Sequence, residues 1–259
     1  MKTRILSGLI LLPLLAVIYL GDTVLLIACL LLSLVGIREF FRGFDNIGVA
    51  PSYFIGYLAA ITLYIIAFLE LNNFYNLLWF YGVIVLSLLY LFKIDRRELA
   101  DAMATITGVF YVVYFSYHLV LIDRTDISIL LWLVILCSFA TDIMAYFTGY
   151  VLGKHKLCPK ISPKKTIEGA IGGIVGSVII SIVFSYLFAY ELLIHCIMIG
   201  FVGSIVSQLG DLTASTFKRK MGIKDYGNLI PGHGGILDRF DSVLFTAPFV
   251  YYYIIIVIY

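Results

Sequence analysis

Long apolar stretches, each broken off by charged residues or by Asn, Gly and Pro, follow one another along almost the whole chain. A helix needs roughly 20 apolar residues to cross a hydrocarbon layer about 30 Å thick. The pattern therefore predicts an all-α, polytopic membrane protein. We expect nine transmembrane helices, at 4–20, 23–41, 52–70, 76–93, 103–122, 127–149, 167–190, 192–210 and 240–259.

Composition supports this interpretation and excludes a soluble globular protein. Of 259 residues, 62% are hydrophobic and 13% are charged, and the mean hydropathy is +1.03, which exceeds what one soluble core requires. The beginning of the chain resembles a signal peptide, but no small-residue cleavage site follows it, so we interpret 4–20 as the first span. Because only Gly21-Asp22 separates the first two spans, and Glu191 the seventh and eighth, eight spans are an alternative.

The positions of the basic residues test the number of spans independently. Nine spans with a cytoplasmic N-terminus leave Arg124 as the one basic residue outside the cytoplasmic segments, so that 17 of 18 lie inside. Fusing or dropping one span would scramble this distribution. The positive-inside rule therefore favours nine spans and a cytoplasmic N-terminus.

The chain divides into two regions by the position of its ionisable residues. Residues 1–127 have short connections and carry their charges at helix ends, as expected of a transmembrane scaffold. From 128 to 259 ionisable residues enter the spans, and the cytoplasmic segments 150–166 and 211–239 become long and basic. Ionisable residues within spans usually mark function, so we expect 128–259 to be the catalytic region.

Three carboxylates border the second of these cytoplasmic segments. Asp211 ends one predicted span, and Asp238 and Asp241 begin the next, so all three are expected at a similar depth near the inner membrane face. Ser215 follows Asp211 by four residues and therefore lies on the same helical face. Mg²⁺ binds one or two carboxylates together with substrate phosphates and water. Alternatively, Asp238 and Asp241 only complement the dipole of a helix N-terminus.

Basic residues and glycines lie between these carboxylates. A glycine-rich run includes His233, Gly234 and Gly235, and its backbone N–H groups can approach an anion closely. His233 is interpreted as a phosphate contact, with proton transfer as the alternative. The basic residues alone could be topology determinants, but their position between the acidic residues favours a phosphate-rich ligand. They are Lys218, Arg219, Lys220, Lys224 and Arg239.

A second polar group lies in and after the predicted span 127–149. Asp142 is placed within an apolar helix, where an ionisable residue is costly and usually functional. Lys164 and Lys165 could contact phosphates or the anionic leaflet. Thr166 is a candidate N-cap, and Glu168 would then lie in the first helical turn, where capping and catalysis are equally good explanations.

Several other classes of protein are not favoured. The chain contains neither a G-x-x-x-x-G-K-[ST] nucleotide-binding loop nor an H-E-x-x-H zinc motif. Its four cysteines are isolated from one another and form no C-x-x-C pair. An ion-coupled transporter is an alternative, although transport sites usually lie near the midplane. The residues favour an integral enzyme that joins a membrane-resident substrate to a soluble polyanion at the cytoplasmic face.

Two sequence patterns closely resemble those of the phosphatidate cytidylyltransferase (CDP-diacylglycerol synthase) family. One is Ser215-x-x-Lys218-Arg219-x-x-x-x-Lys224-Asp225, continued by Pro231-Gly-His233-Gly234-Gly235-x-x-Asp238-Arg239-x-Asp241. The other combines Asp142-x-x-Ala-Tyr146 with Ser162-Pro-Lys-Lys-Thr-x-Glu168-Gly. Residues 1–127 resemble the family only in hydropathy.

The resemblance implies condensation of CTP with phosphatidic acid to CDP-diacylglycerol and pyrophosphate, in phospholipid biosynthesis, with Mg²⁺ as cofactor. A second cation is left open. It implies Asp211 and Asp238 as metal ligands, with Asp241, Ser215 and Asp142 beside them. It implies that Lys218, Arg219, Lys224 and Arg239 neutralise phosphates. We expect no nucleic acid partner. We expect an integral protein of the inner membrane with its active site at the cytoplasmic face. Another lipid phosphate as substrate, a homodimer, and Tyr146 or Tyr226 as contacts of the base are left open.

Overall fold

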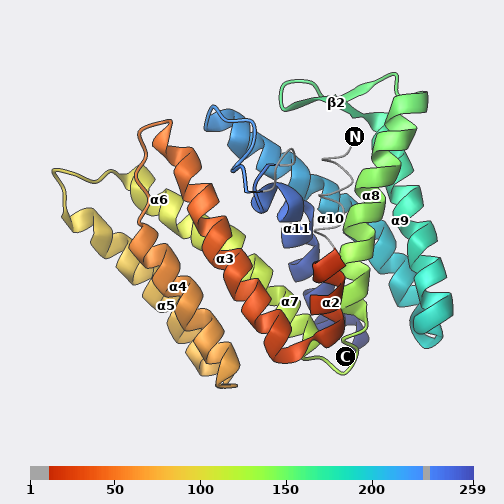
Figure 1. The fold of residues 1–259 in the computed structure, drawn as a ribbon, viewed down its shortest axis with the longest axis horizontal. Helices are drawn as coiled ribbons and strands as arrows, with labels where there is room; N and C mark the ends of the chain where they lie inside the picture. The colour runs from red at the N-terminus through yellow and green to blue at the C-terminus, as the bar shows by residue number, and fades with distance from the viewer. Residues whose placement is uncertain (1–11, 230–233) are drawn as a thin grey trace. The chain divides into compact units, whose positions relative to one another are not determined.

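The computed structural model describes residues 12–229 and 234–259, which form two compact units (Figure 1). Unit 1 consists of the chain up to Val120 together with Lys220–Arg239. Unit 2 consists of Leu121–Arg219 together with Phe240–Tyr259. The basic segment 220–239, which the sequence groups with the C-terminal region, thus belongs to the same unit as the N-terminal helices. The assignment of scaffold and catalytic roles to 1–127 and 128–259 stays a prediction.

Unit 1 is built from apolar helices joined by short connections. Ser52 caps α4, where its hydroxyl accepts a hydrogen bond from the Ile55 N–H, and Asn72 caps α5 in the same way through the Phe74 N–H. A π-helical segment and a 3-10 turn continue two of the helices without a break. The elements are α2 (Leu12–Leu20), α3 (Asp22–Asp45), α4 (Tyr53–Phe68), α5 (Asn73–Leu89), η1 (Tyr90–Phe92), α6 (Leu99–Gly108), η2 (Val109–Tyr114) and α7 (Phe115–Asp123), which ends in unit 2.

The core of unit 1 lies around α3, which packs against α4, α6 and η2. Ile37, Phe40 and Phe41 of α3 are fully buried. Ser33 donates a hydrogen bond of 3.1 Å to the Tyr64 hydroxyl, and Ser116 lies 2.8 Å from Ser33. These hydroxyls satisfy one another, as buried polar groups must.

Unit 2 contains the long helices α8 and α9, which lie side by side (Figure 1). Their close approach follows from small residues on α9, because a side chain at Gly173 would meet the Thr141 carbonyl at 3.0 Å and Ala145 at 3.2 Å. Small residues at such contacts are typical of membrane helices. The elements are α8 (Leu130–Leu152), β1 (Lys156–Cys158), β2 (Ser162–Thr166), α9 (Ile167–Phe188), η3 (Tyr190–Leu192), α10 (Leu193–Lys220), α11 (Leu237–Tyr253), which begins in unit 1, and η4 (Ile254–Ile258).

An antiparallel hairpin connects α8 to α9, where the sequence analysis expects only a cytoplasmic loop. Its register pairs Lys156 with Thr166 and Cys158 with Ser162. Thr166 then caps α9, because its hydroxyl accepts a hydrogen bond of 3.1 Å from the Gly169 N–H. The predicted N-cap is therefore confirmed, and the hairpin is a small addition to an otherwise helical fold.

The described helices follow the predicted apolar stretches in order. Within residues 12–229 and 234–259, seven helical segments are long and apolar enough to cross a membrane. The stretch predicted at 52–70 is the 16-residue α4, and the one predicted at 4–20 is described only from Leu12. An α-helical membrane protein is thus confirmed, and nine spans stay a prediction. The seven segments are Asp22–Asp45, Asn73–Phe92, Leu99–Asp123, Leu130–Leu152, Ile167–Phe188, Tyr190–Lys220 and Leu237–Ile258.

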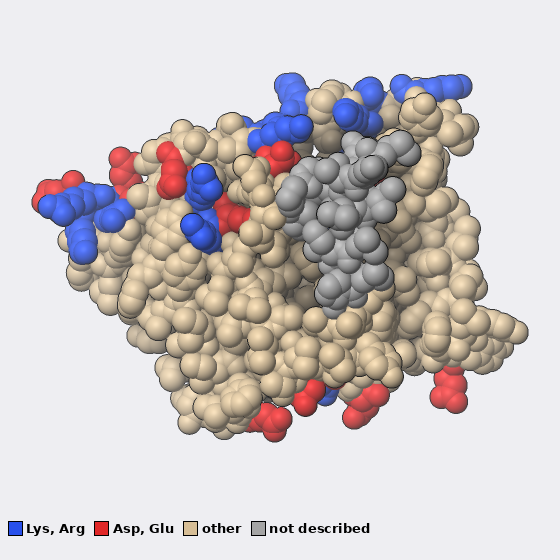
Figure 2. All heavy atoms as spheres, viewed as in Figure 1, with Lys and Arg blue, Asp and Glu red and all other residues tan. Residues whose placement is uncertain are grey.

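The surface of each unit agrees with a membrane environment. Large apolar side chains such as Phe54 and Tyr81 in unit 1, or Ile194 and Ile256 in unit 2, are exposed along the helices. In Figure 2 the charged side chains in view lie toward the upper and lower edges, and a broad tan surface without charges lies between them. Apolar surface on this scale is stable in lipid and not in water.

Candidate active site

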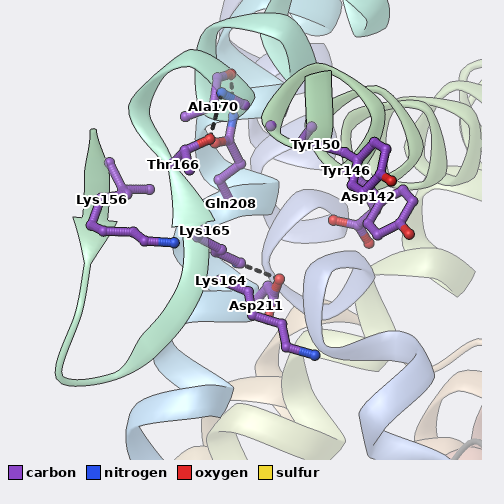
Figure 3. Close-up of a pocket in the computed structure, with 14 residues that line it drawn as sticks. Asp142, Tyr146, Tyr150, Lys156, Lys164, Lys165, Thr166, Ala170, Gln208 and Asp211 are labelled. Atoms are coloured by element: carbon purple, nitrogen blue, oxygen red, sulfur yellow. Dashed lines mark hydrogen bonds and ion pairs between the residues drawn. The ribbon is translucent and has the colours of Figure 1, made fainter. Parts of the chain in front are cut away.

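Unit 2 contains a pocket of about 560 Å³ where the hairpin overlies the ends of three helices. The basic side chains come from the hairpin, and the acidic ones come from α8 and α10. In Figure 3 Lys156 and Lys165 extend from the strands toward the centre, and Asp142 and Tyr146 of α8 lie on the other side. The lining residues that carry polar groups are Asp142, Tyr146, Tyr150, Lys156, Lys164, Lys165, Thr166, Gln208 and Asp211.

Asp211 is the acidic group that the hairpin contacts directly. Its carboxylate forms an ion pair with the Lys165 ammonium, and both side chains keep about a quarter of their surface exposed. The Ser215 hydroxyl lies 3.4 Å from the other Asp211 oxygen, as the spacing of four residues predicts. On the preceding turn of α10, the Gln208 amide donates a hydrogen bond of 3.3 Å to the Ala170 carbonyl of α9. These contacts hold the acidic face of α10 toward the pocket.

Asp241 is a buried carboxylate in the same unit, with only 8% of its surface exposed. One of its oxygens accepts a hydrogen bond of 2.8 Å from the Ser242 N–H. It interacts electrostatically with Asp211, Asp142 and Lys218, so two of its three charged neighbours are acidic. A buried carboxylate among carboxylates is unfavourable unless positive charge compensates it. The arrangement suits a cation as an additional partner.

The donor set fits Mg²⁺ only in part. The oxygens of Asp142, Asp211 and Asp241 are the hard ligands that Mg²⁺ prefers. Among the described residues, however, no three Asp, Glu, His or Cys side chains are arranged to hold a metal ion by themselves. Because Mg²⁺ commonly takes only one or two carboxylates and completes its shell with phosphate and water, the residues fit an ion that binds together with a nucleotide.

Asp238 has a different environment, in unit 1. Its Oδ2 atom accepts hydrogen bonds from the N–H groups of Tyr226, at 2.8 Å, and Gly235, at 2.9 Å. Gly234 has a φ of +87°, a conformation that residues other than glycine rarely adopt. Asp238 therefore closes the loop before α11. Its predicted role as a metal ligand stays a prediction.

The other predicted basic residues lie in unit 2 or in unit 1, and one predicted residue lies outside the described part of the chain. Lys164 and Lys165 line the pocket, and Lys218 interacts with Asp241. Arg219 donates a hydrogen bond of 3.3 Å to the Ile161 carbonyl, which ties the end of α10 to the hairpin. Lys224 is exposed and Arg239 is half-buried, both in unit 1. His233 lies outside the described residues.

Glu168 has a structural explanation. It accepts hydrogen bonds from the backbone N–H groups of Lys154 and His155, at 3.1 and 3.2 Å, and its second oxygen lies 2.6 Å from His155 Nδ1. Glu168 thus holds the chain where it leaves α8. His118 and His195 contact the Tyr114 carbonyl and the Tyr253 hydroxyl, respectively.

The sequence analysis misses three residues that line the pocket or make buried contacts in the structure. Lys156 and Gln208 line the pocket, although Lys156 is one of many loop lysines and Gln208 lies in an apolar stretch. Glu39 is buried in unit 1 and contacts the loop before α11. One signal could have identified Glu39, because it is an isolated acidic residue near the end of the predicted apolar span 23–41.

Comparison with known proteins identifies the family. The model of the cytidylyltransferase family matches residues 2–257. The chain belongs to this family. The phosphatidate cytidylyltransferase of Staphylococcus haemolyticus is 35% identical over 257 residues, which cover 96% of each chain. That of Staphylococcus aureus strain COL is 34% identical over 261 residues, again 96% of each. That of Bacillus subtilis is 40% identical over 115 residues, or 44% of this chain and 43% of the relative.

Membership of the cytidylyltransferase family confirms the resemblance seen in the sequence motifs. It extends the similarity over residues 1–127, for which hydropathy alone had suggested it. Together with the apolar helices, it makes the chain an integral membrane nucleotidyltransferase.

Proposed function

We propose that this membrane nucleotidyltransferase condenses CTP with phosphatidate, giving CDP-diacylglycerol and pyrophosphate. The names of the relatives support the substrate class. The observation that carries the proposal is the pocket of unit 2, because it brings three lysines of the hairpin to Asp142 and Asp211. A nucleoside triphosphate needs cations for its phosphates and carboxylates for its metal ion.

The reaction exchanges one phosphoanhydride bond for another. A phosphate oxygen of phosphatidate attacks the α-phosphorus of CTP, the bond to the bridging oxygen of the β-phosphate breaks, and pyrophosphate leaves. Since the second pKa of a phosphate monoester is about 6, the attacking oxygen is largely ionised near neutral pH and needs no strong general base. No covalent intermediate with the enzyme is required.

The residues of the pocket act by charge and position. Lys156, Lys164 and Lys165 neutralise phosphate oxygens of the bound nucleotide and orient the leaving pyrophosphate. The Lys165 ammonium, which pairs with Asp211, exchanges that partner for phosphate when CTP binds. One or two of the carboxylates of Asp142, Asp211 and Asp241, together with phosphate oxygens and water, would hold Mg²⁺. The ion would supply positive charge to the developing phosphate anions.

The proposed orientation places this pocket at the cytoplasmic face of the inner membrane. Supporting it, nine spans with a cytoplasmic N-terminus leave 17 of 18 basic residues on one side. The lysines of the hairpin are among them. In this orientation CTP reaches the pocket from the cytoplasm. Phosphatidate reaches the same face from the surrounding bilayer.

The decisive experiment measures liponucleotide formation by detergent-purified protein given phosphatidic acid and CTP, with and without Mg²⁺. Parallel reactions contain ATP, GTP or UTP. We expect CDP-diacylglycerol and pyrophosphate in equal amounts, only with CTP and Mg²⁺. No product from folded protein would contradict the proposal. Activity on a different lipid phosphate would redirect it, and ion flux into liposomes without nucleotide would favour a transporter.

A further inference from the structure

Glu39 is a buried carboxylate that binds the beginning of another helix. It lies near the end of α3, beside the fully buried Phe40 and Phe41, and only 8% of its surface is exposed. Its two oxygens accept hydrogen bonds of 3.0 Å from the backbone N–H groups of Ile236 and Leu237. Leu237 is the first residue of α11. The N–H groups in the first turn of a helix have no partner within that helix. Glu39 therefore caps a helix that begins almost 200 residues later.

Two glycines adapt the loop before α11 to this carboxylate. A side chain at Gly227 would stand 2.5 Å from Glu39 Oε1, and one at Gly235 would overlap the same carboxylate. The glycines lie on both sides of the residues 230–233. Only residues without a side chain let the backbone approach Glu39 so closely.

Asp238 completes the arrangement from within the loop. Its Oδ2 atom binds the N–H groups of Tyr226 and Gly235, so it joins the loop's beginning to its end. Glu39 interacts electrostatically with Asp238. Two carboxylates thus share four backbone N–H groups, and the one at position 39 comes from the N-terminal helices.

We propose that Glu39 is a positioning residue for the cytidylyl transfer. It holds the beginning of α11, which carries Asp238 and Arg239, in the position that turnover requires. The inference rests on the proposed function. Misplacement of reacting groups by about 1 Å can cost roughly a hundredfold in rate, so a displaced segment should impair turnover in folded protein.

The test is Glu39→Gln, which keeps the size of the side chain but turns one acceptor into a donor facing an N–H group. The matched control is Glu70→Gln, since Glu70 is exposed between α4 and α5. Two readouts are compared in detergent-purified, monodisperse protein. One is hydrogen exchange of a peptide covering 234–240. The other is kcat and KM for CTP, well below the melting temperature.

We expect faster exchange of that peptide in Glu39→Gln and a kcat/KM for CTP lowered at least about tenfold, with Glu70→Gln within twofold of wild type. Unchanged exchange or unchanged kinetics per folded molecule would overturn the inference, even if the melting temperature fell. If Glu39→Gln does not fold, Gly227→Ala decides by the same two readouts, because it presses on the same carboxylate. Where both fold, their combined effect should be smaller than the product of the two, as for residues that share one contact.

The wild-type protein separates this inference from the proposed function. Wild-type protein that forms no CDP-diacylglycerol contradicts the function itself. Active wild-type protein with an equally active, normally protected Glu39→Gln variant contradicts only the role of Glu39.

Discussion

Two carboxylates of unit 1, Glu39 and Asp238, have an environment opposite to that of Asp211 and Asp241 in unit 2. In unit 1, Glu39 and Asp238 are engaged by backbone N–H groups. In unit 2, Asp211 pairs with a lysine, and Asp241 has two carboxylates among its charged neighbours. The sequence contains the same kind of residue in both places. Their partners distinguish a carboxylate that fixes the backbone from one that can bind a ligand.

The comparison distinguishes two ways in which the charge of a carboxylate near a membrane is compensated. A carboxylate that accepts backbone N–H groups at a helix N-terminus is compensated by the protein itself. The carboxylates grouped in unit 2 are compensated in part by lysines, Lys165 at Asp211 and Lys218 at Asp241, and a bound cation would compensate them further. We therefore expect the pocket in unit 2 to depend on ligands, and the loop in unit 1 to depend on its internal hydrogen bonds.

The largest expected effect is the loss of activity when Mg²⁺ is removed. Chelation by excess EDTA should reduce CDP-diacylglycerol formation to background, because the phosphate charge and the grouped carboxylates both lack their cation. Addition of Mg²⁺ beyond the chelator should restore the rate. Full activity in excess EDTA would show that the lysines suffice and that the carboxylates of unit 2 serve another purpose.

The second largest effect is expected for Asp211→Asn, which should lower turnover by at least about a hundredfold. The substitution keeps the size of the side chain but removes the charge that pairs with Lys165. The protein should remain inserted and monodisperse by size-exclusion chromatography. Asp126→Asn, at an exposed position in unit 2, is the matched control and should keep wild-type activity. Near-normal activity of Asp211→Asn would refute the assignment of Asp211 to the metal.

The sequence analysis predicted correctly those features that depend on local patterns of residues. Hydropathy predicted the helices because each is defined by its own local run of apolar residues. Asp142, Lys164, Lys165 and Asp211 were predicted as site residues, and they line one pocket. Their chemical roles remain predictions.

What the sequence did not reveal depends on distant partners or on weak patterns. Glu39 binds residues almost 200 positions away, and no local spacing indicates such a contact. The β1–β2 hairpin escaped prediction because Ser162-Pro-Lys-Lys-Thr166 lacks the alternation of apolar and polar residues that predicts a strand. The pairing of Lys156 with Thr166 that forms this hairpin places Lys156 at the pocket.

Lys165→Met should lower kcat/KM for CTP by about ten- to a hundredfold, the cost of losing one charge-assisted phosphate contact. Lys160→Met is the matched control, since Lys160 is exposed between the two strands and does not line the pocket. Steady-state kinetics with CTP as the varied substrate distinguish the two variants. Equal losses would indicate that the hairpin acts through its overall positive charge, and activity of both should then fall steeply with salt.

The smallest effect is expected for Glu168→Gln, which tests whether burial or hydrogen bonding gives Glu39 its importance. Glu168 also accepts two backbone N–H groups, but its other partner, the His155 side chain, is 73% exposed. Water can replace such contacts at little cost, and glutamine keeps one acceptor oxygen. We expect activity within about threefold of wild type, measured beside Glu39→Gln under identical conditions. If Glu168→Gln is impaired as strongly as Glu39→Gln, burial does not separate the two glutamates, and the hairpin's attachment to α8 is as critical as the loop before α11.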